Sequence, residues 1–150
     1  MLIKNFIAFW SSAILVLIIV CTAGCSSVTV DGEKLKYPDA ITLFRLGLYS
    51  PYCEIKSRTE IEKVYSFFDG AEFVLSDERL TEDDGNIYFK EIVWICFGDD
   101  FYDFSVAENG KAECTFDGQH YISEEGAVDY AGLKAFVDKK IREYLERVFG

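Results

Sequence analysis

The sequence predicts an α+β fold, an antiparallel sheet of about four to five strands with two helices on one face. Two stretches carry apolar residues at helical spacing, and the region between them alternates apolar and polar residues. Turn signals separate the alternating segments, and such short connections join antiparallel neighbours. We therefore expect a single domain over residues 41–149, in the order strand, helix, strand meander, helix.

The first predicted strand covers residues 41–49, which are dense in strand-forming side chains and end at Ser50-Pro51. A helix should follow, because Ser57 and Glu60 have the spacing of a capping box. The apolar residues at helical spacing in this segment are Ile61, Val64, Tyr65 and Phe68. Asp69-Gly70 then predicts the end of the helix.

The middle of the chain predicts a meander of strands. Residues 72–75 form a short candidate strand, residues 76–86 an acidic surface loop and residues 86–97 a long central strand. Three further strands are expected at residues 101–108, 111–116 and 119–122, with tight turns at Asn109-Gly110 and Asp117-Gly118.

The C-terminal segment predicts a second helix that packs on the sheet. Asp129 is a suitable N-cap. The apolar stripe consists of Tyr130, Leu133, Val137, Ile141, Tyr144 and Val148, widened by Phe136 and Leu145. The opposite face carries charges of both signs, whereas a helix lying on a membrane surface favours a cationic face.

The first residues have the pattern of a secretory signal peptide. Lys4 is the only charge before Asp31, and an almost wholly apolar run extends over residues 6–20. Small residues at positions 22–24 then precede Cys25, as expected before a cleavage site.

Ala23-Gly24-Cys25 resembles the lipobox of bacterial lipoproteins, with Thr22 where leucine is usual. The resemblance covers residues 1–25 and implies that residues 1–24 are removed and that Cys25 carries lipid. Residues 25–40 would then be a tether that holds the domain on the extracytoplasmic side of the cell membrane. Two alternatives are an uncleaved transmembrane helix, because no charge occurs over residues 5–30, and ordinary secretion. All three place the domain beyond the inner membrane.

The charge balance limits the class of partner. The chain has 26 acidic and 15 basic residues and a net charge of −11, and loss of Lys4 makes it one unit more negative. Such a surface repels nucleic acid and anionic headgroups, so we expect no nucleic-acid partner. Solubility is the simpler explanation, and binding of a basic protein is the alternative.

The sequence carries no convincing catalytic constellation, and we predict that the protein is not an enzyme and holds no cofactor. His120 is the only histidine in the sequence. The predicted hairpin points its side chain away from that of Cys114, so the two residues are poorly placed to form a catalytic Cys–His pair. The acidic segment of residues 77–86 does not fit the spacing of an EF-hand, so we predict no metal site. Cys53, Cys96 and Cys114 are too few for a disulfide framework, which favours buried free thiols.

The candidate binding surface is a set of aromatic side chains, namely Tyr88, Trp94, Tyr102, Phe104 and Tyr121. The alternative role of this set is to form core beneath a helix. The sequence thus predicts a lipid-anchored, non-catalytic acidic domain that binds a protein or small ligand at the cell envelope. An immunity or inhibitor protein directed against a basic toxin or enzyme is the alternative function.

Overall fold

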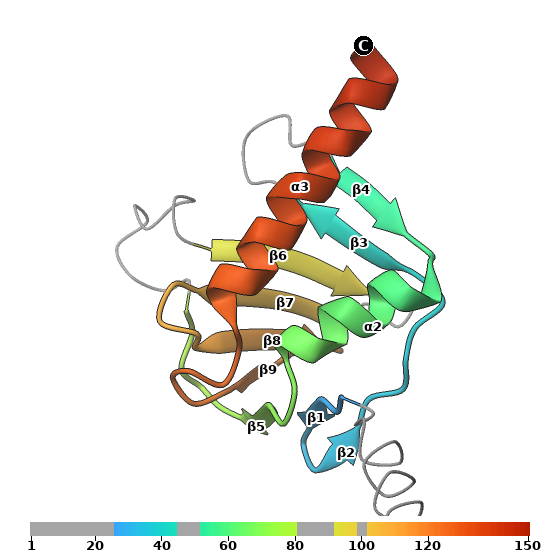
Figure 1. Ribbon diagram of the computed structural model, residues 1–150. Helices are drawn as coiled ribbons and strands as arrows, with labels where there is room; N and C mark the ends of the chain where they lie inside the picture. Colours follow the sequence, from blue (N-terminus) through green and yellow to red (C-terminus); the bar gives the residue numbers. More distant parts are fainter. Residues whose placement is uncertain (1–25, 45–51, 81–91, 99–101) are drawn as a thin grey trace, which may run out of the picture.

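A computed structural model describes residues 26–44, 52–80, 92–98 and 102–150 (Figure 1). The strands in this part of the chain are β1 (Thr29–Val30), β2 (Glu33–Lys34), β3 (Ile41–Phe44), β4 (Tyr52–Ile55), β5 (Glu72–Leu75), β6 (Ile92–Phe97), β7 (Tyr102–Ala107), β8 (Ala112–Phe116) and β9 (Gln119–Ile122). The described helices are α2 (Arg58–Phe67) and α3 (Tyr130–Phe149). Figure 1 shows both helices over the same face of a curled sheet.

The described strands form one sheet in the order β2-β1-β5-β9-β8-β7-β6-β3-β4. The predicted antiparallel sheet of about four to five strands is therefore wrong: this sheet has nine strands, curls into a half-barrel and is mixed, because β1 and β5 run parallel. The prediction failed because β1, β2 and β4 have only two or four residues. Strands of this length show too little alternation to be recognised from sequence.

Residues 28–34 belong to the fold, although the sequence predicts a tether over residues 25–40. Val28 and Val30 are 0% and 5% exposed and join the core, and β1 pairs with both β2 and β5. Asp31 and Gly32 adopt φ of 51° and 78°, as a two-residue hairpin turn requires. The described fold therefore begins three residues after Cys25, rather than at Ile41.

The predicted turns of the meander are confirmed. Asp117 and Gly118 both have positive φ and join β8 to β9, and Gly110 has a φ of +77° in the connection from β7 to β8. A side chain at Gly110 would also collide with Val128, since a Cβ there would lie 2.6 Å from its carbonyl oxygen. The described part of the predicted long strand is β6, an interior strand that pairs with β3 and β7.

Both predicted helices are confirmed, and their caps differ. The Asp129 side chain accepts a hydrogen bond of 2.9 Å from the backbone N–H of Gly132, which satisfies one free donor of α3. Ser57 is the N-cap of α2, but its side chain makes no capping hydrogen bond. Its backbone carbonyl accepts from the N–H groups of Glu60 and Ile61 instead.

The core lies between the two helices and the face of the sheet beneath them. Alternate strand residues such as Leu43, Ile95 and Phe104 point to this face and are fully buried. The Phe68 ring of the segment after α2 lies 5.3 Å from the Phe104 ring, centroid to centroid, in an edge-to-face contact. Helix α3 adds Leu133, whose side chain is also fully buried.

The predicted free cysteines are confirmed for the part of the chain that the structure describes. Cys53 and Cys114 are buried, Cys96 is half-buried, and all three thiols are free. Burial raises the pKa of the Cys96 thiol to about 12 and also raises that of Cys53 and Cys114. These thiols are therefore protonated, and poor nucleophiles, at neutral pH.

Candidate functional site

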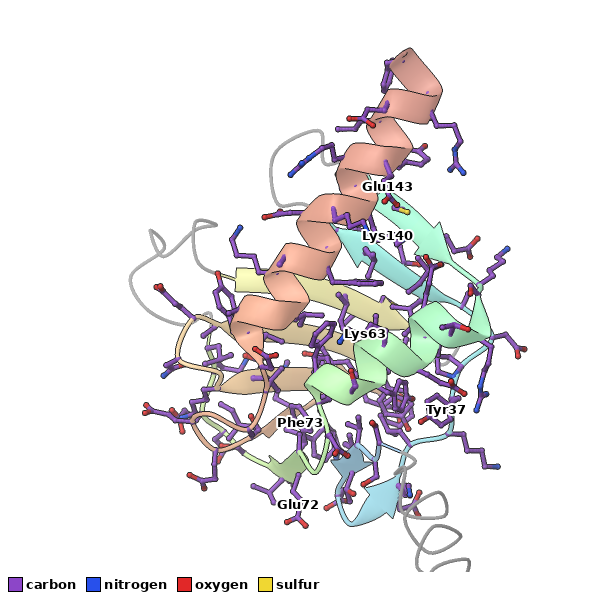
Figure 2. All side chains as sticks on the ribbon, viewed as in Figure 1. Tyr37, Lys63, Glu72, Phe73, Lys140 and Glu143 are labelled. Atoms are coloured by element: carbon purple, nitrogen blue, oxygen red, sulfur yellow. The ribbon has the colours of Figure 1, made fainter. Side chains whose placement is uncertain are left out.

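An open groove separates the exposed edges of α2 and α3, and we call it the α2–α3 groove. Its charged lining residues are Arg58, Lys63, Lys139, Lys140, Glu60 and Glu62, and its other lining residues include Ser26, Tyr37 and Phe136. Figure 2 shows Lys63 on α2 and Lys140 on α3 on the same side of the molecule, with Tyr37 beside α2.

The helical repeat places the charged residues of this groove on the outside. Helix α2 turns Ile61 and Val64 into the core, so Arg58 and Glu62, one turn apart, lie on its exposed side. The Arg58 Nε donates to Glu62 Oε1 over 2.7 Å. Helix α3 buries Val137 and Ile141 in the same way, which leaves Lys139 and Lys140 on its exposed or half-exposed surface.

Lys140 links the two helices. Its Nζ forms ion pairs with Glu60 of α2 and, over 3.0 Å, with Glu143 Oε2 of α3. Hydrogen bonds to these two carboxylates raise the pKa of Lys140. The hydrogen bond from Lys140 lowers the pKa of the Glu143 carboxyl. Both groups are therefore charged at neutral pH, and the ion pair of Lys140 with Glu60 joins α2 to α3 at the surface.

Tyr37 forms an aromatic surface at one end of the groove. Its ring lies 4.3 Å from the ring of Tyr65, centroid to centroid, and the Arg58 guanidinium lies 4.1 Å above its centroid. The Tyr37 hydroxyl donates to the backbone carbonyl of Ser26 over 3.3 Å. The Ser27 carbonyl in turn accepts from the backbone N–H of Gly70 over 3.0 Å. The start of the described chain is thus fixed to this end of the groove.

The groove has a charge that the whole chain does not share. It gathers four basic and two acidic side chains, whereas the chain has 15 basic and 26 acidic residues. Clustered cations can bind anionic groups such as carboxylates and phosphates. The sequence does not predict this site, because the two halves of its lining are at least 70 residues apart in the chain.

A second polar cluster, the Glu113 cluster, lies on the opposite face of the sheet. It consists of Glu113, His120, Arg79, Thr115 and the backbone of Leu80. Cys114 faces the helices from β8, so Glu113 and Thr115 face the other way. Glu113 is nevertheless only 3% exposed.

The Glu113 carboxylate is fully engaged by its neighbours. Its Oε1 accepts from Arg79 Nε over 2.9 Å and from His120 Nδ1 over 3.0 Å, and its Oε2 accepts from the Leu80 N–H over 2.8 Å. Because a carboxylate only accepts, the proton of the neutral His120 ring belongs on Nδ1. This arrangement fixes the ring and leaves Nε2 as an acceptor.

Among the residues that the structure describes, the contacts of the Glu113 cluster orient His120 on the sheet. The Nδ1 atom of His120, which contacts Glu113, also lies 3.2 Å from Thr115 Oγ1. Within the described ranges, no group of three or more histidine, cysteine, aspartate or glutamate side chains is arranged to hold a metal ion. The contacts of this cluster instead join residues 76–80 to β8 and β9, helped by a bond of 3.0 Å from Ser76 N–H to the His120 carbonyl.

The predicted aromatic binding surface is distributed over different environments. Phe104 and Tyr121 are 0% and 5% exposed in the core, and the half-exposed Tyr102 stacks on Phe116 with centroids 4.0 Å apart. Trp94 belongs to β6, where it pairs with Ser105, but its side chain lies outside the description. Tyr88 and the predicted lipidation residue Cys25 lie outside the described residues.

Comparisons with known protein families, curated proteins and solved structures find no match to this chain. Neither of the helices in the described part of the chain has the length and apolar character needed to cross a membrane.

Proposed function

We propose that this protein is a lipid-anchored binding protein of the cell envelope, held at the membrane through acylated Cys25 and without catalytic activity. The observation that carries the proposal is the Ala23-Gly24-Cys25 sequence after an apolar run, followed within three residues by a folded domain. A signal that ends at residue 24, four residues before the first core residue Val28, suits removal of residues 1–24 without loss of any described part of the fold.

The polar sites support binding rather than catalysis. The thiols are protonated at neutral pH because their burial raises their pKa. The described contacts of His120 are with Glu113 and Thr115, which hold the ring in place on the sheet. The α2–α3 groove, by contrast, is open to solvent and gathers basic side chains, which suits recognition of an anionic group.

The decisive experiment is the intact mass of the protein extracted from membranes of its own host, compared with a Cys25→Ser variant. We expect the wild-type mass to equal residues 25–150 plus acyl groups, and the variant to lack the acyl groups. A full-length mass for both proteins would contradict the lipid anchor and favour a retained helix. A mass of the cleaved chain without lipid would favour ordinary secretion.

The non-catalytic part of the proposal has its own test. The variant His120→Ala should keep whatever biological effect the wild type has, provided that the domain is still folded by circular dichroism. Loss of the effect in a folded variant would contradict this part of the proposal.

A further inference from the structure

We propose that the α2–α3 groove is the surface that the domain lays against the membrane, where its basic side chains contact the phosphates of anionic lipid headgroups. This inference rests on the proposed anchoring function and adds an orientation to it. It draws on three observations that concern the same end of the molecule, namely the fixed start of the chain, the local charge and the adjacent aromatic rings.

The first described residues would bring the groove close to the bilayer if Cys25 carries the lipid. Ser26 lines the groove, and it follows the predicted lipidation residue directly in the sequence. Its carbonyl accepts from Tyr37, and the carbonyl of Ser27 accepts from Gly70. A lipid on Cys25 therefore has almost no free chain between itself and the groove. One residue of extended chain spans no more than about 3.6 Å.

The charge distribution selects this face. The chain as a whole is strongly acidic, so most orientations of the domain would bring carboxylates to an anionic bilayer. The groove lining instead has four basic side chains against two acidic ones. Electrostatic forces at a membrane act over about 8 Å at physiological salt, so the face next to the anchor decides the outcome.

The exposed side chains of the groove can reach lipid phosphates. The side chains of Lys139 and Arg58 are 70% and 64% exposed. Their ion pairs with Glu143 and Glu62 are exposed pairs of the kind that contribute little energy and that a lipid phosphate can replace. Lys63 is also exposed, and its Nζ lies 4.7 Å from the centroid of the Phe67 ring. Tyr37, which lines the same groove, is an aromatic residue of the kind that favours the membrane–water interface. Figure 2 shows Lys63 and Lys140 on the two helices, with Tyr37 beside α2.

The test measures the labelling of lysine amines in the full-length gene product after purification and reconstitution. The acylated protein is placed in detergent micelles, in phosphatidylcholine vesicles, and in vesicles that also contain phosphatidylglycerol. Lysines are then acetylated and quantified by mass spectrometry. We expect Lys63 and Lys139 to be protected about fivefold in the phosphatidylglycerol vesicles relative to the other two conditions.

Lys56 is the matched control for labelling. Its side chain is 70% exposed, as is that of Lys139, and it lies outside the lining of the groove. Its labelling should be the same in all three conditions. High salt should abolish the protection of Lys63 and Lys139, because the screening length falls to about 3 Å at 1 M salt.

A pair of double variants tests which charges cause the docking. In Lys63→Gln/Lys139→Gln, the protection of Arg58 from phenylglyoxal should be lost, whereas Lys56→Gln/Lys134→Gln removes the same charge elsewhere and should retain it. Equal labelling of the groove lysines in all conditions would overturn the inference. Protection that is already complete in micelles would also overturn it, because the groove would then be covered without lipid.

The intact mass of the same samples separates this inference from the proposed function. An acylated protein without groove protection would refute the docking and leave the lipid anchor standing. A full-length protein with groove protection would refute the lipid anchor and leave the docking standing, with residues 1–24 retained.

Discussion

The α2–α3 groove and the Glu113 cluster are built from the same kinds of residue, yet they differ in their exposure to water. In the groove, the side chains of Arg58 and Glu62 are 64% and 50% exposed. In the Glu113 cluster, the Glu113 side chain is 4% exposed and has three hydrogen-bond donors. Water screens the charges in the first region, whereas it hardly reaches the Glu113 carboxylate in the second. Ion pairs should therefore matter little for stability in the groove and much in the cluster.

The largest effect should come from Glu113→Ala, which breaks the buried side of the comparison. It leaves Arg79 without its carboxylate and the Leu80 N–H without an acceptor. We expect a loss of about 3 kcal/mol in the free energy of unfolding, measured by urea denaturation at neutral pH. Glu62→Ala in the groove is the control and should cost less than about 1 kcal/mol. Equal losses would contradict the difference between the two regions.

A smaller effect should follow from Arg79→Met, which removes one partner and leaves His120 beside Glu113. The Arg79 side chain is 29% exposed, so water can reach part of the vacated space. We expect a loss of about 2 kcal/mol in the same measurement.

The combination with Glu113→Ala tests whether the two residues act together. Because they are in direct contact, the double variant Glu113→Ala/Arg79→Met should lose less stability than the sum of the two single losses. Strict additivity would show that the short distance between them contributes no coupling.

The sequence predicts those parts of the fold that depend on neighbours within a few residues. The Asp129 cap, the apolar stripe of α3 and the Asp117-Gly118 turn are of this kind. Asp31-Gly32 carries the same turn signal and forms the same kind of turn. The strands on either side of it have only two residues each, which is too few to show the alternation of apolar and polar residues that identifies a strand. Local patterns therefore identified the helices and the longer strands, but they gave too small a number of strands for the sheet.

Neither polar region could be predicted from the sequence, for a different reason. Arg79 and Glu113 are 34 residues apart, in an acidic segment and in a strand, and nothing local marks them as partners. Lys140 and Glu60 are similarly brought together only by the packing of α3 against α2. The net charge of the chain also conceals a basic groove, because it averages over all surfaces. Tertiary packing determines the Arg79–Glu113 pair, the Lys140–Glu60 pair and the local charge of the groove.

On the exposed side of the comparison, Lys140→Met should have a modest effect. Lys140 bridges Glu60 and Glu143, and its side chain is 20% exposed. We expect a loss below about 1 kcal/mol, which becomes smaller still at high salt. The measurement is the urea midpoint at low and high ionic strength. Lys56→Met, which removes the exposed ion pair of Lys56 with Glu54, is the control. A large loss that does not respond to salt would place this pair with the buried cluster.

The smallest effect, and the sharpest test of the groove, is a dependence on pH. The hydrogen bond from Lys140 lowers the pKa of Glu143 below its ordinary value of 4.5. A lowered carboxyl pKa stabilises the folded state at pH values above the ordinary one, and this contribution is lost as the pH falls through the folded-state pKa. Glu143→Gln should therefore be less stable than the wild type at neutral pH, and the difference should vanish in acid.

In a Lys140→Met background the same substitution should have much less effect at any pH, because the main cause of the lowered pKa is gone. Urea midpoints between neutral pH and pH values below 4.5 would measure this, and a difference that persists in acid would assign the role of Glu143 to packing rather than to charge.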